Sequence, residues 1–267
     1  RQRQMCIRDR NKSEPVKDQA VIIQGRHIKN IVPVDKIPQD MKQNHQVFDV
    51  KGRYLLPGFI DTHTHLQMSG KEPEIRLFNE SVPKKAFRAA FNARKTLEAG
   101  FTTVRDLGAE YLIDLALRDA INEGLAMGPR MFVSGYKIMP TGADFSLYAP
   151  EVEIHGRHTM DSPAEIKKAV RTLLARGVDL IKVMTSGRTF RPTSSPDAHA
   201  LTLEDTKLVV EEAHNQNRTV SAHAHGSKGV KIALQAGCDT LEHGTVLDEE
   251  DIEMMLKNHV FLVPTLS

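Results

Sequence analysis

The chain lacks tryptophan, has only two cysteines among its 267 residues, and carries a formal net charge of only +2. Cys6 and Cys238 cannot form a disulfide framework, so the cysteine content fits a reducing, cytoplasmic setting. The near balance of charges gives no reason to expect nucleic acid or a membrane surface as a partner. No apolar run approaches the roughly 20 residues that span a bilayer. Histidine, with twelve copies, is the unusual feature of the composition, and its placement decides the interpretation.

The first ten residues (RQRQMCIRDR) show neither the period of a strand nor that of a helix, and they are more typical of translated vector sequence than of a native start. We therefore expect residues 1–18 to be a non-native or disordered segment, with the true N-terminus missing. Residues 19–54 contain short β-like pieces separated by Gly, Pro and Asp, which predicts part of a small β-sandwich. Its expected strands are 20–24, 28–34 and 46–50.

From residue 55 to residue 267, apolar strands alternate with helical stretches, and this repeated βα pattern predicts a parallel sheet. The expected strands are 55–60, 102–106, 130–134, 180–184, 220–224, 240–242 and 261–263. The expected helices are 84–99, 111–123, 163–175, 203–215, 227–236 and 249–258. Gly100, Gly177 and Gly237 each follow a helix, in the position of a left-handed cap. A closed (β/α)8 barrel needs eight strands, so the sequence predicts an α/β protein with an incomplete TIM barrel of about seven strands.

The two longest connections, residues 135–161 and 185–201, follow the third and fourth barrel strands. Both leave the C-terminal ends of their strands, where barrel enzymes build their active sites. Loops longer than about 12–15 residues are usually either functional or disordered. Their position favours a functional role.

Histidines end three of the seven predicted strands. Side chains two apart on a strand point to the same side, so His63 and His65 face one way, and so do His223 and His225. His243 ends the next strand. A single strand-end histidine is usually no more than a hydrogen-bonded polar residue, but this repetition favours a shared metal site, because imidazole is a good ligand for Zn, Fe, Ni or Cu.

Lys182 stands between Ile181 and Val183 on a predicted interior strand. Burying a charged ammonium there is costly, which favours the neutral amine. A neutral amine can react with carbon dioxide to form a carbamate, an anionic ligand able to bridge two cations. A lysine that reaches along the barrel to a carboxylate explains the residue equally well, so both interpretations stay open.

Five motifs together resemble the amidohydrolase superfamily, and most closely its imidazolonepropionase-related branch, which includes Xaa-Pro dipeptidases (prolidases). The resemblance runs in order over residues 19–267. The motifs are Pro57-Gly-Phe-Ile-Asp-Thr-His-Thr-His65, Gly100-Phe-Thr-Thr-Val-Arg-Asp-Leu-Gly108, Ile181-Lys-Val183, Ala222-His-Ala-His-Gly226 and Leu241-Glu-His-Gly244.

The resemblance implies one or two divalent metal ions, zinc by default. His63 and His65 would bind the more buried ion, a carboxylated Lys182 would bridge both, and His223 and His243 would bind the second, while His225 would face the substrate. Imidazolonepropionase itself binds one metal and lacks the bridging lysine, so Lys182 favours the two-metal, dipeptidase-like members.

The superfamily's last metal ligand is an aspartate at the end of the eighth strand, which also acts as general base. The sequence stops after the seventh predicted strand, and no residue matches that aspartate. We therefore expect the chain to be C-terminally truncated, to contain no catalytic residue of its own, and to be inactive in isolation although its parent protein is a hydrolase.

The implied reaction is hydrolysis of a small amide or dipeptide by a water molecule that the metal activates. A substrate carboxylate needs a polar or cationic partner, for which Tyr136, Arg188, Arg191 and His155 are candidates, although each is more often an ordinary surface residue. Two alternatives stay open: a cyclic-amide hydrolase on the same scaffold, and a barrel that acts as a binding or structural protein. Assembly into a homo-oligomer stays open as well.

Three further polar residues lie within the motifs. Asp61 shares the face of His63 and is placed either to accept a hydrogen bond from a ligand imidazole or to cap a loop. Arg105 and Asp106 are adjacent at the end of the second predicted strand, where they could form a structural pair.

Overall fold

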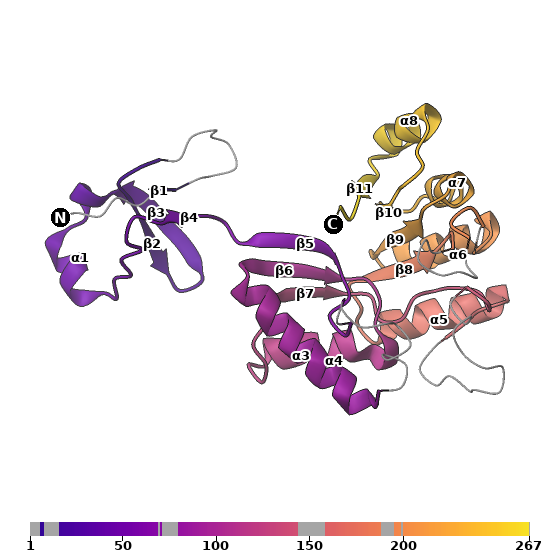
Figure 1. Ribbon diagram of the computed structural model, residues 1–267, viewed down its shortest axis with the longest axis horizontal. Helices are drawn as coiled ribbons and strands as arrows, with labels where there is room; N and C mark the ends of the chain where they lie inside the picture. Colours follow the sequence, from indigo (N-terminus) through magenta and orange to yellow (C-terminus); the bar gives the residue numbers. More distant parts are fainter. Residues whose placement is uncertain are drawn as a thin grey trace. The chain divides into compact units, whose positions relative to one another are not determined.

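The computed structural model describes residues 6–7, 16–68, 70, 80–143, 158–187, 195–198 and 200–266. The chain divides into two compact units, Arg1–Gly58 and Phe59–Ser267 (Figure 1). No helix among the described residues combines the length and the apolar character needed to cross a membrane.

The first unit contains two small β-ladders and a short helix. Strands β2 (Gln19–Gln24) and β3 (His27–Pro33) form an antiparallel hairpin, and β1 (Cys6–Ile7) pairs with β4 (Tyr54–Leu55) in parallel. A 3-10 turn (Val34–Lys36) and helix α1 (Gln39–Asn44) follow the hairpin. The prediction of a strand at residues 46–50 was wrong. The apolar side chains of this segment do not pack against a sheet, and Phe48 is 76% exposed.

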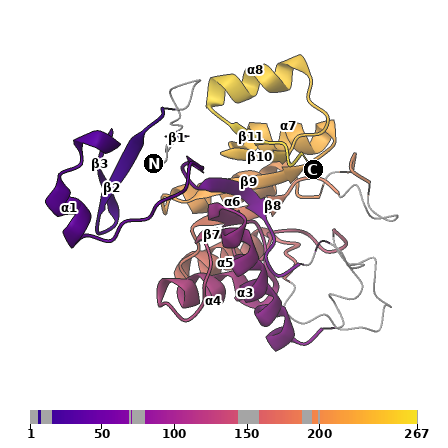
Figure 2. The same ribbon diagram turned by 60° about the vertical axis from the view of Figure 1, so that its left-hand side comes forward.

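The second unit is built from seven parallel strands and six α-helices within the described residues, which confirms the barrel-type α/β fold (Figures 1 and 2). Hydrogen-bonded neighbours run in the order β5-β6-β7 and β8-β9-β10-β11. The strands are β5 (Phe59–Thr64), β6 (Phe101–Asp106), β7 (Arg130–Val133), β8 (Leu180–Met184), β9 (Thr219–Ala224), β10 (Thr240–His243) and β11 (Phe261–Val263). The helices are α3 (Val82–Glu98), α4 (Ile113–Asn122), α5 (Pro163–Ala175), α6 (Leu203–His214), α7 (Ser227–Ala236) and α8 (Glu249–Asn258).

Ile138 connects β8 to the segment that follows β7. Its amide donates to Lys182 O at 2.8 Å and its carbonyl accepts from Met184 N at 3.0 Å, which forms a parallel bridge opposite Val183. This segment therefore pairs with the edge of β8 that faces away from β9. The backbone amides and carbonyls that form the bridge have their hydrogen bonds satisfied.

The first barrel strand lies later in the sequence than predicted. Residues 55–60 were expected to form it, but β5 begins at Phe59, whose amide donates to Gly100 O at 2.9 Å. Pro57 has no amide hydrogen to continue a ladder, which separates β4 from β5. As a consequence, His63 lies within β5 and His65 immediately after it.

Helix boundaries follow signals that the sequence carries. Ser162 and Thr202 cap α5 and α6 by accepting the amides of Glu165 and Asp205, and Asp248 caps α8 in a reciprocal capping box. The three predicted cap glycines all have positive φ, between 79° and 97°. The predicted helix at 111–123 instead begins at Ile113, after a short 3-10 helix (Glu110–Leu112).

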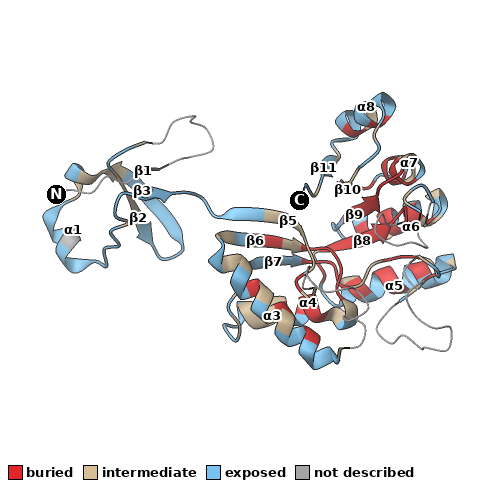
Figure 3. Cartoon of the chain, in the orientation of Figure 1, coloured by how far each residue is buried: buried red, intermediate tan, exposed pale blue. Residues whose placement is uncertain are grey.

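Burial concentrates in β6–β10 and in the inner faces of the helices, whereas no residue of β5 or β11 is buried (Figure 3). All five residues of β8 are buried, including Ile181 and Val183, and α5 packs its apolar stripe inward. Burying an isoleucine or valine side chain contributes about 1.5–3 kcal/mol. The core thus holds β8, and with it Lys182, in a fixed position.

Candidate metal centre

Five imidazoles converge at the C-terminal ends of the barrel strands. The ring of His243 lies 4.4 Å from that of His225, 4.6 Å from His223 and 5.0 Å from His63, measured between centroids. His63 and His65 are 5.3 Å apart and nearly perpendicular. The structure therefore brings together histidines from the ends of β5, β9 and β10, which are far apart in the sequence.

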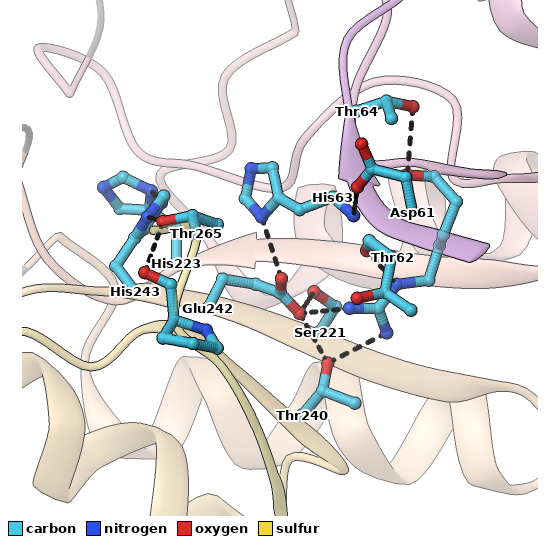
Figure 4. A network of polar contacts seen from close by, with 12 residues as sticks. Asp61, Thr62, His63, Thr64, Ser221, His223, Thr240, Glu242, His243 and Thr265 are labelled. Atoms are coloured by element: carbon cyan, nitrogen blue, oxygen red, sulfur yellow. Dashed lines mark hydrogen bonds and ion pairs between the residues drawn. The ribbon is translucent and has the colours of Figure 1, made fainter. Parts of the chain in front are cut away.

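Three of these rings form the tightest group. One nitrogen from each of His223, His225 and His243 lies within 4.8 Å of the others. His243 Nε2 is 3.0 Å from His223 Nδ1, and its Nδ1 is 2.7 Å from Thr265 Oγ1 (Figure 4). His243 also has a left-handed backbone, with φ of 71°, a strained conformation for this residue type that the surrounding structure must enforce.

Hydrogen-bond acceptors define the tautomers of three rings, because a carbonyl can only accept a hydrogen bond. His65 Nδ1 lies 3.1 Å from Gly108 O, and His223 Nε2 lies 3.3 Å from Gly187 O. His65 then carries its hydrogen on Nδ1 and offers the lone pair of Nε2, while His223 does the reverse. For His63, Nδ1 lies 2.8 Å from a carboxylate oxygen of Glu242, which favours the same tautomer as in His65.

Burial keeps the imidazoles of His63, His65 and His243 neutral. It lowers the pKa of His63, and lowers the pKa of His65 well below its usual range, with the nearby positive charge of Lys137 adding to the effect on His65. Burial, and next the charge of Lys182, lower the pKa of His243 to about 3. A neutral imidazole is the form that binds a metal ion, so these rings are ready to act as ligands at neutral pH.

Lys182 is 2% exposed and sits at the centre of β8. Its charge acts on His63, His65 and His243 and on the carboxylate of Glu242, which places it electrostatically in the histidine cluster. Lys182 thus joins the four histidines with which it was grouped from sequence.

Glu242 is the main site residue that sequence reasoning missed. It is fully buried on β10, next to His243, and Figure 4 shows its carboxylate at the centre of a polar network. Oε1 accepts from Ser221 at 2.8 Å, Thr240 at 2.7 Å and Arg105 Nη2 at 2.5 Å. Although burial opposes ionisation, the hydrogen bond to His63 and the charges of Lys182 and Arg105 lower the pKa of Glu242 to about 2. The signal in the sequence that could have identified Glu242 is the presence of an acidic residue within a short predicted strand.

The three accessory motif residues take specific roles. Asp61 accepts the backbone amide of His63 at 3.0 Å within β5, at the point where the pairing of β5 with β6 shifts register. Arg105 pairs with Glu242, not with its neighbour Asp106. Asp106 is 1% exposed and accepts the amide of Leu66 at 2.9 Å. Burial raises the pKa of Asp106 well above its usual value.

Lys137 is a second residue that sequence reasoning missed. Its stem crosses Gly108, where an added Cβ would lie 2.6 Å from Lys137 Cε. The absence of a side chain at Gly108 lets the lysine approach the end of β6. Lys137 therefore brings a positive charge to the neighbourhood of His65 and Asp106, where it favours the ionised carboxylate.

Among the expected substrate-binding residues, Tyr136 points toward α5. Its hydroxyl is 3.4 Å from Ala169 O and its ring is 4.1 Å from that of His158. It is not part of the histidine cluster. His225 does lie in the cluster, with Nδ1 2.9 Å from Thr245 Oγ1 and its ring stacked on His243. The remaining candidates, Arg188, Arg191 and His155, lie outside the described residues.

The residues present suit a divalent metal ion of the transition series. The donors are imidazole nitrogens at strand ends, their orientations are set by hydrogen bonds, and buried Lys182 stands among them. Imidazole is a preferred ligand of Zn and related ions, and ligating histidines characteristically donate their other N–H to a carbonyl or carboxylate, as His63 and His65 do.

Comparison with known proteins gives the same picture. The chain is 30% identical to ochratoxinase of Aspergillus niger over 275 residues, an alignment that covers 95% of this chain and 56% of ochratoxinase. The structure superposes on a Xaa-Pro dipeptidase with bound methionine at a TM-score of 0.87 and 30% identity, covering 98% of this chain and 66% of that one. A prolidase complexed with N-methylphosphonate-L-proline gives a TM-score of 0.84 at 28% identity, with 98% and 66% covered.

The chain spans about half to two thirds of the length of these relatives. The sequence profile of the Amidohydrolase family matches residues 54–267, from the last strand of the first unit through the whole second unit. With this match and a histidine cluster at the ends of parallel barrel strands, the chain belongs to the amidohydrolase family.

Proposed function

We propose that this protein is a metal-dependent hydrolase of a small amide or peptide bond, with a dipeptidase-like or prolidase-like substrate. The observation that carries the proposal is the convergence of five imidazoles and Lys182 at one rim of the strands. The names of the similar proteins, ochratoxinase, Xaa-Pro dipeptidase and prolidase, support a substrate of this class.

His63 and His65 would hold one divalent ion and His223 and His243 a second, with Lys182 between them and zinc as the proposed metal. The lysine amine would attack carbon dioxide, form an N–C bond and release a proton, which leaves an anionic carbamate oxygen donor. A bound cation of this kind lowers the pKa of a water ligand and polarises a carbonyl.

The chain's own groups orient the imidazoles. His65 and His223 are directed by the carbonyls of Gly108 and Gly187, and His63 by Glu242. We assign His225 to the substrate on the sequence resemblance alone, because His225 and the proposed ligand His243 both contact a threonine hydroxyl through Nδ1. Tyr136 and Arg188 stay proposals for contacting a substrate carboxylate.

The test is metal content and hydrolysis measured on the full-length parent protein, because this chain is expected to be inactive in isolation. We expect about two zinc ions per chain by elemental analysis, as in two-metal hydrolases, and hydrolysis of Xaa-Pro dipeptides when a panel of dipeptides and cyclic amides is assayed. His63→Ala and His223→Ala should each lose metal, whereas His27→Ala, at an exposed histidine of β3, should bind as the unchanged protein does. Turnover of cyclic amides alone would favour the imidazolonepropionase-like alternative. Failure of the unchanged protein to bind metal would refute the proposal.

A further inference from the structure

The buried pair of Arg105 and Glu242 links strands that carry different parts of the histidine cluster. Arg105 lies on β6, next to β5, whereas Glu242 lies on β10. Within the described residues β5–β7 and β8–β11 form separate ladders, which are joined between β7 and β8 by the backbone bond from Asp179 N to Val133 O at 2.8 Å, and the Arg105–Glu242 pair adds a side-chain link between the two groups of strands. The guanidinium of Arg105 reaches Glu242 Oε1 at 2.5 Å and Thr240 Oγ1 at 3.2 Å.

The same pair holds both the backbone and the ring of the β5 histidine. Arg105 Nε donates to Thr62 O at 2.7 Å, one residue before His63, and Glu242 Oε2 lies 2.8 Å from His63 Nδ1 (Figure 4). The two carboxylate oxygens of Glu242 thus have different partners. Oε1 is held by Arg105, Ser221 and Thr240, and Oε2 is directed at the imidazole.

We propose that Glu242, held by Arg105, is a positioning residue that fixes His63 as its Nδ1–H tautomer and aims Nε2 at the metal. The inference rests on the proposed function for its metal, but not for its geometry. An ionised carboxylate has no hydrogen to donate, so the imidazole must donate to it. A carboxylate behind a ligating histidine orients the ring and increases its basicity, and its removal typically weakens metal binding roughly 10- to 100-fold.

A purely structural ion pair would make a different prediction. It would hold the two groups of strands together, and its loss would lower stability without changing the tautomer of His63 or the metal affinity of the folded protein. Such a pair needs no histidine, because Arg105, Ser221 and Thr240 already satisfy Oε1. The contact to His63 is therefore the feature to test.

The test compares Glu242→Gln with Glu212→Gln, a matched change in the Arg171–Glu212 pair on the helix surface. In the metal-free protein labelled with ¹⁵N-histidine, His63 should show a protonated Nδ1, and Glu242→Gln should mix the two tautomers because a glutamine amide can donate as well as accept. Zinc affinity, measured by chelator competition, should fall roughly 10- to 100-fold for Glu242→Gln and stay unchanged for Glu212→Gln.

Two outcomes would overturn the inference. One is a His63 that carries its hydrogen on Nε2 in the unchanged protein, which needs no variant to observe. The other is a folded Glu242→Gln protein with unaltered tautomer and zinc affinity. If the unchanged protein binds no zinc, the proposed function fails, while the tautomer measurement still decides whether Glu242 orients His63.

Discussion

The carboxylate of Glu242 should contribute strongly to stability, in a way that depends on pH. Its pKa is lowered from 4.5 to about 2, a shift that corresponds to about 3 kcal/mol. For a carboxyl group whose pKa is lower in the folded state, this stability is present above the unfolded pKa and is lost as pH falls through the folded value. The contribution is thus complete at neutral pH and declines between about pH 4.5 and about pH 2.

Urea unfolding of the metal-free protein measures this contribution. Glu242→Gln should lower the free energy of unfolding by about 3 kcal/mol at neutral pH, and the difference from the unchanged protein should shrink as the pH approaches about 2. Arg105→Met should lower the free energy of unfolding by about 3–5 kcal/mol, because it leaves the buried carboxylate of Glu242 with fewer partners. Combining both changes should recover part of the loss, with a coupling of about 1–3 kcal/mol.

The surface pair supplies the control. Arg171→Met should cost far less than Arg105→Met, since the Arg171 side chain is 65% exposed and solvent screens its pairing with Glu212. If Glu242→Gln lowered the free energy of unfolding by the same amount at neutral pH as at about pH 3, the argument from the charge of Glu242 would be refuted. Glu242 would then stabilise the fold only through packing.

Three further changes have expected outcomes. Lys182→Met should remove the buried amine that is proposed to form the carbamate, and it should lower the zinc content, as elemental analysis would show. Asp114, whose pKa is raised to about 6 by burial, should make the unchanged protein lose stability as pH rises from about 4 to about 6, and Asp114→Asn should flatten this part of the profile in thermal melts. Gly229→Ala should lower stability by about 1–3 kcal/mol in thermal unfolding, because the added Cβ would lie 2.6 Å from Ser186 Cβ.

Local patterns were enough to predict most elements of the barrel unit. Helices α5, α7 and α8 begin and end at the predicted residues, since Pro163 and Gly237 mark boundaries that depend on only a few neighbouring positions. The exceptions are segments whose sequence favours a strand but which have no neighbouring strand to pair with at the predicted positions. Residues 46–50 have strand-like composition but form no ladder, and β5 starts late because Pro57 interrupts the pairing.

Strand periodicity and the spacing of βα units identify which residues stand at the strand ends, because neither depends on distant contacts. These local signals are sufficient to group His63, His65, His223 and His243, whereas Lys182 was added to the group by the family resemblance. The pairing of Arg105 with Glu242, and the contact of Glu242 with His63, are decided by the folded arrangement instead. In the sequence, Arg105 and Glu242 are separated by 137 positions, and His63 and Glu242 by 179 positions. Their contacts depend on strand register and on how the strands face each other, which no local pattern encodes.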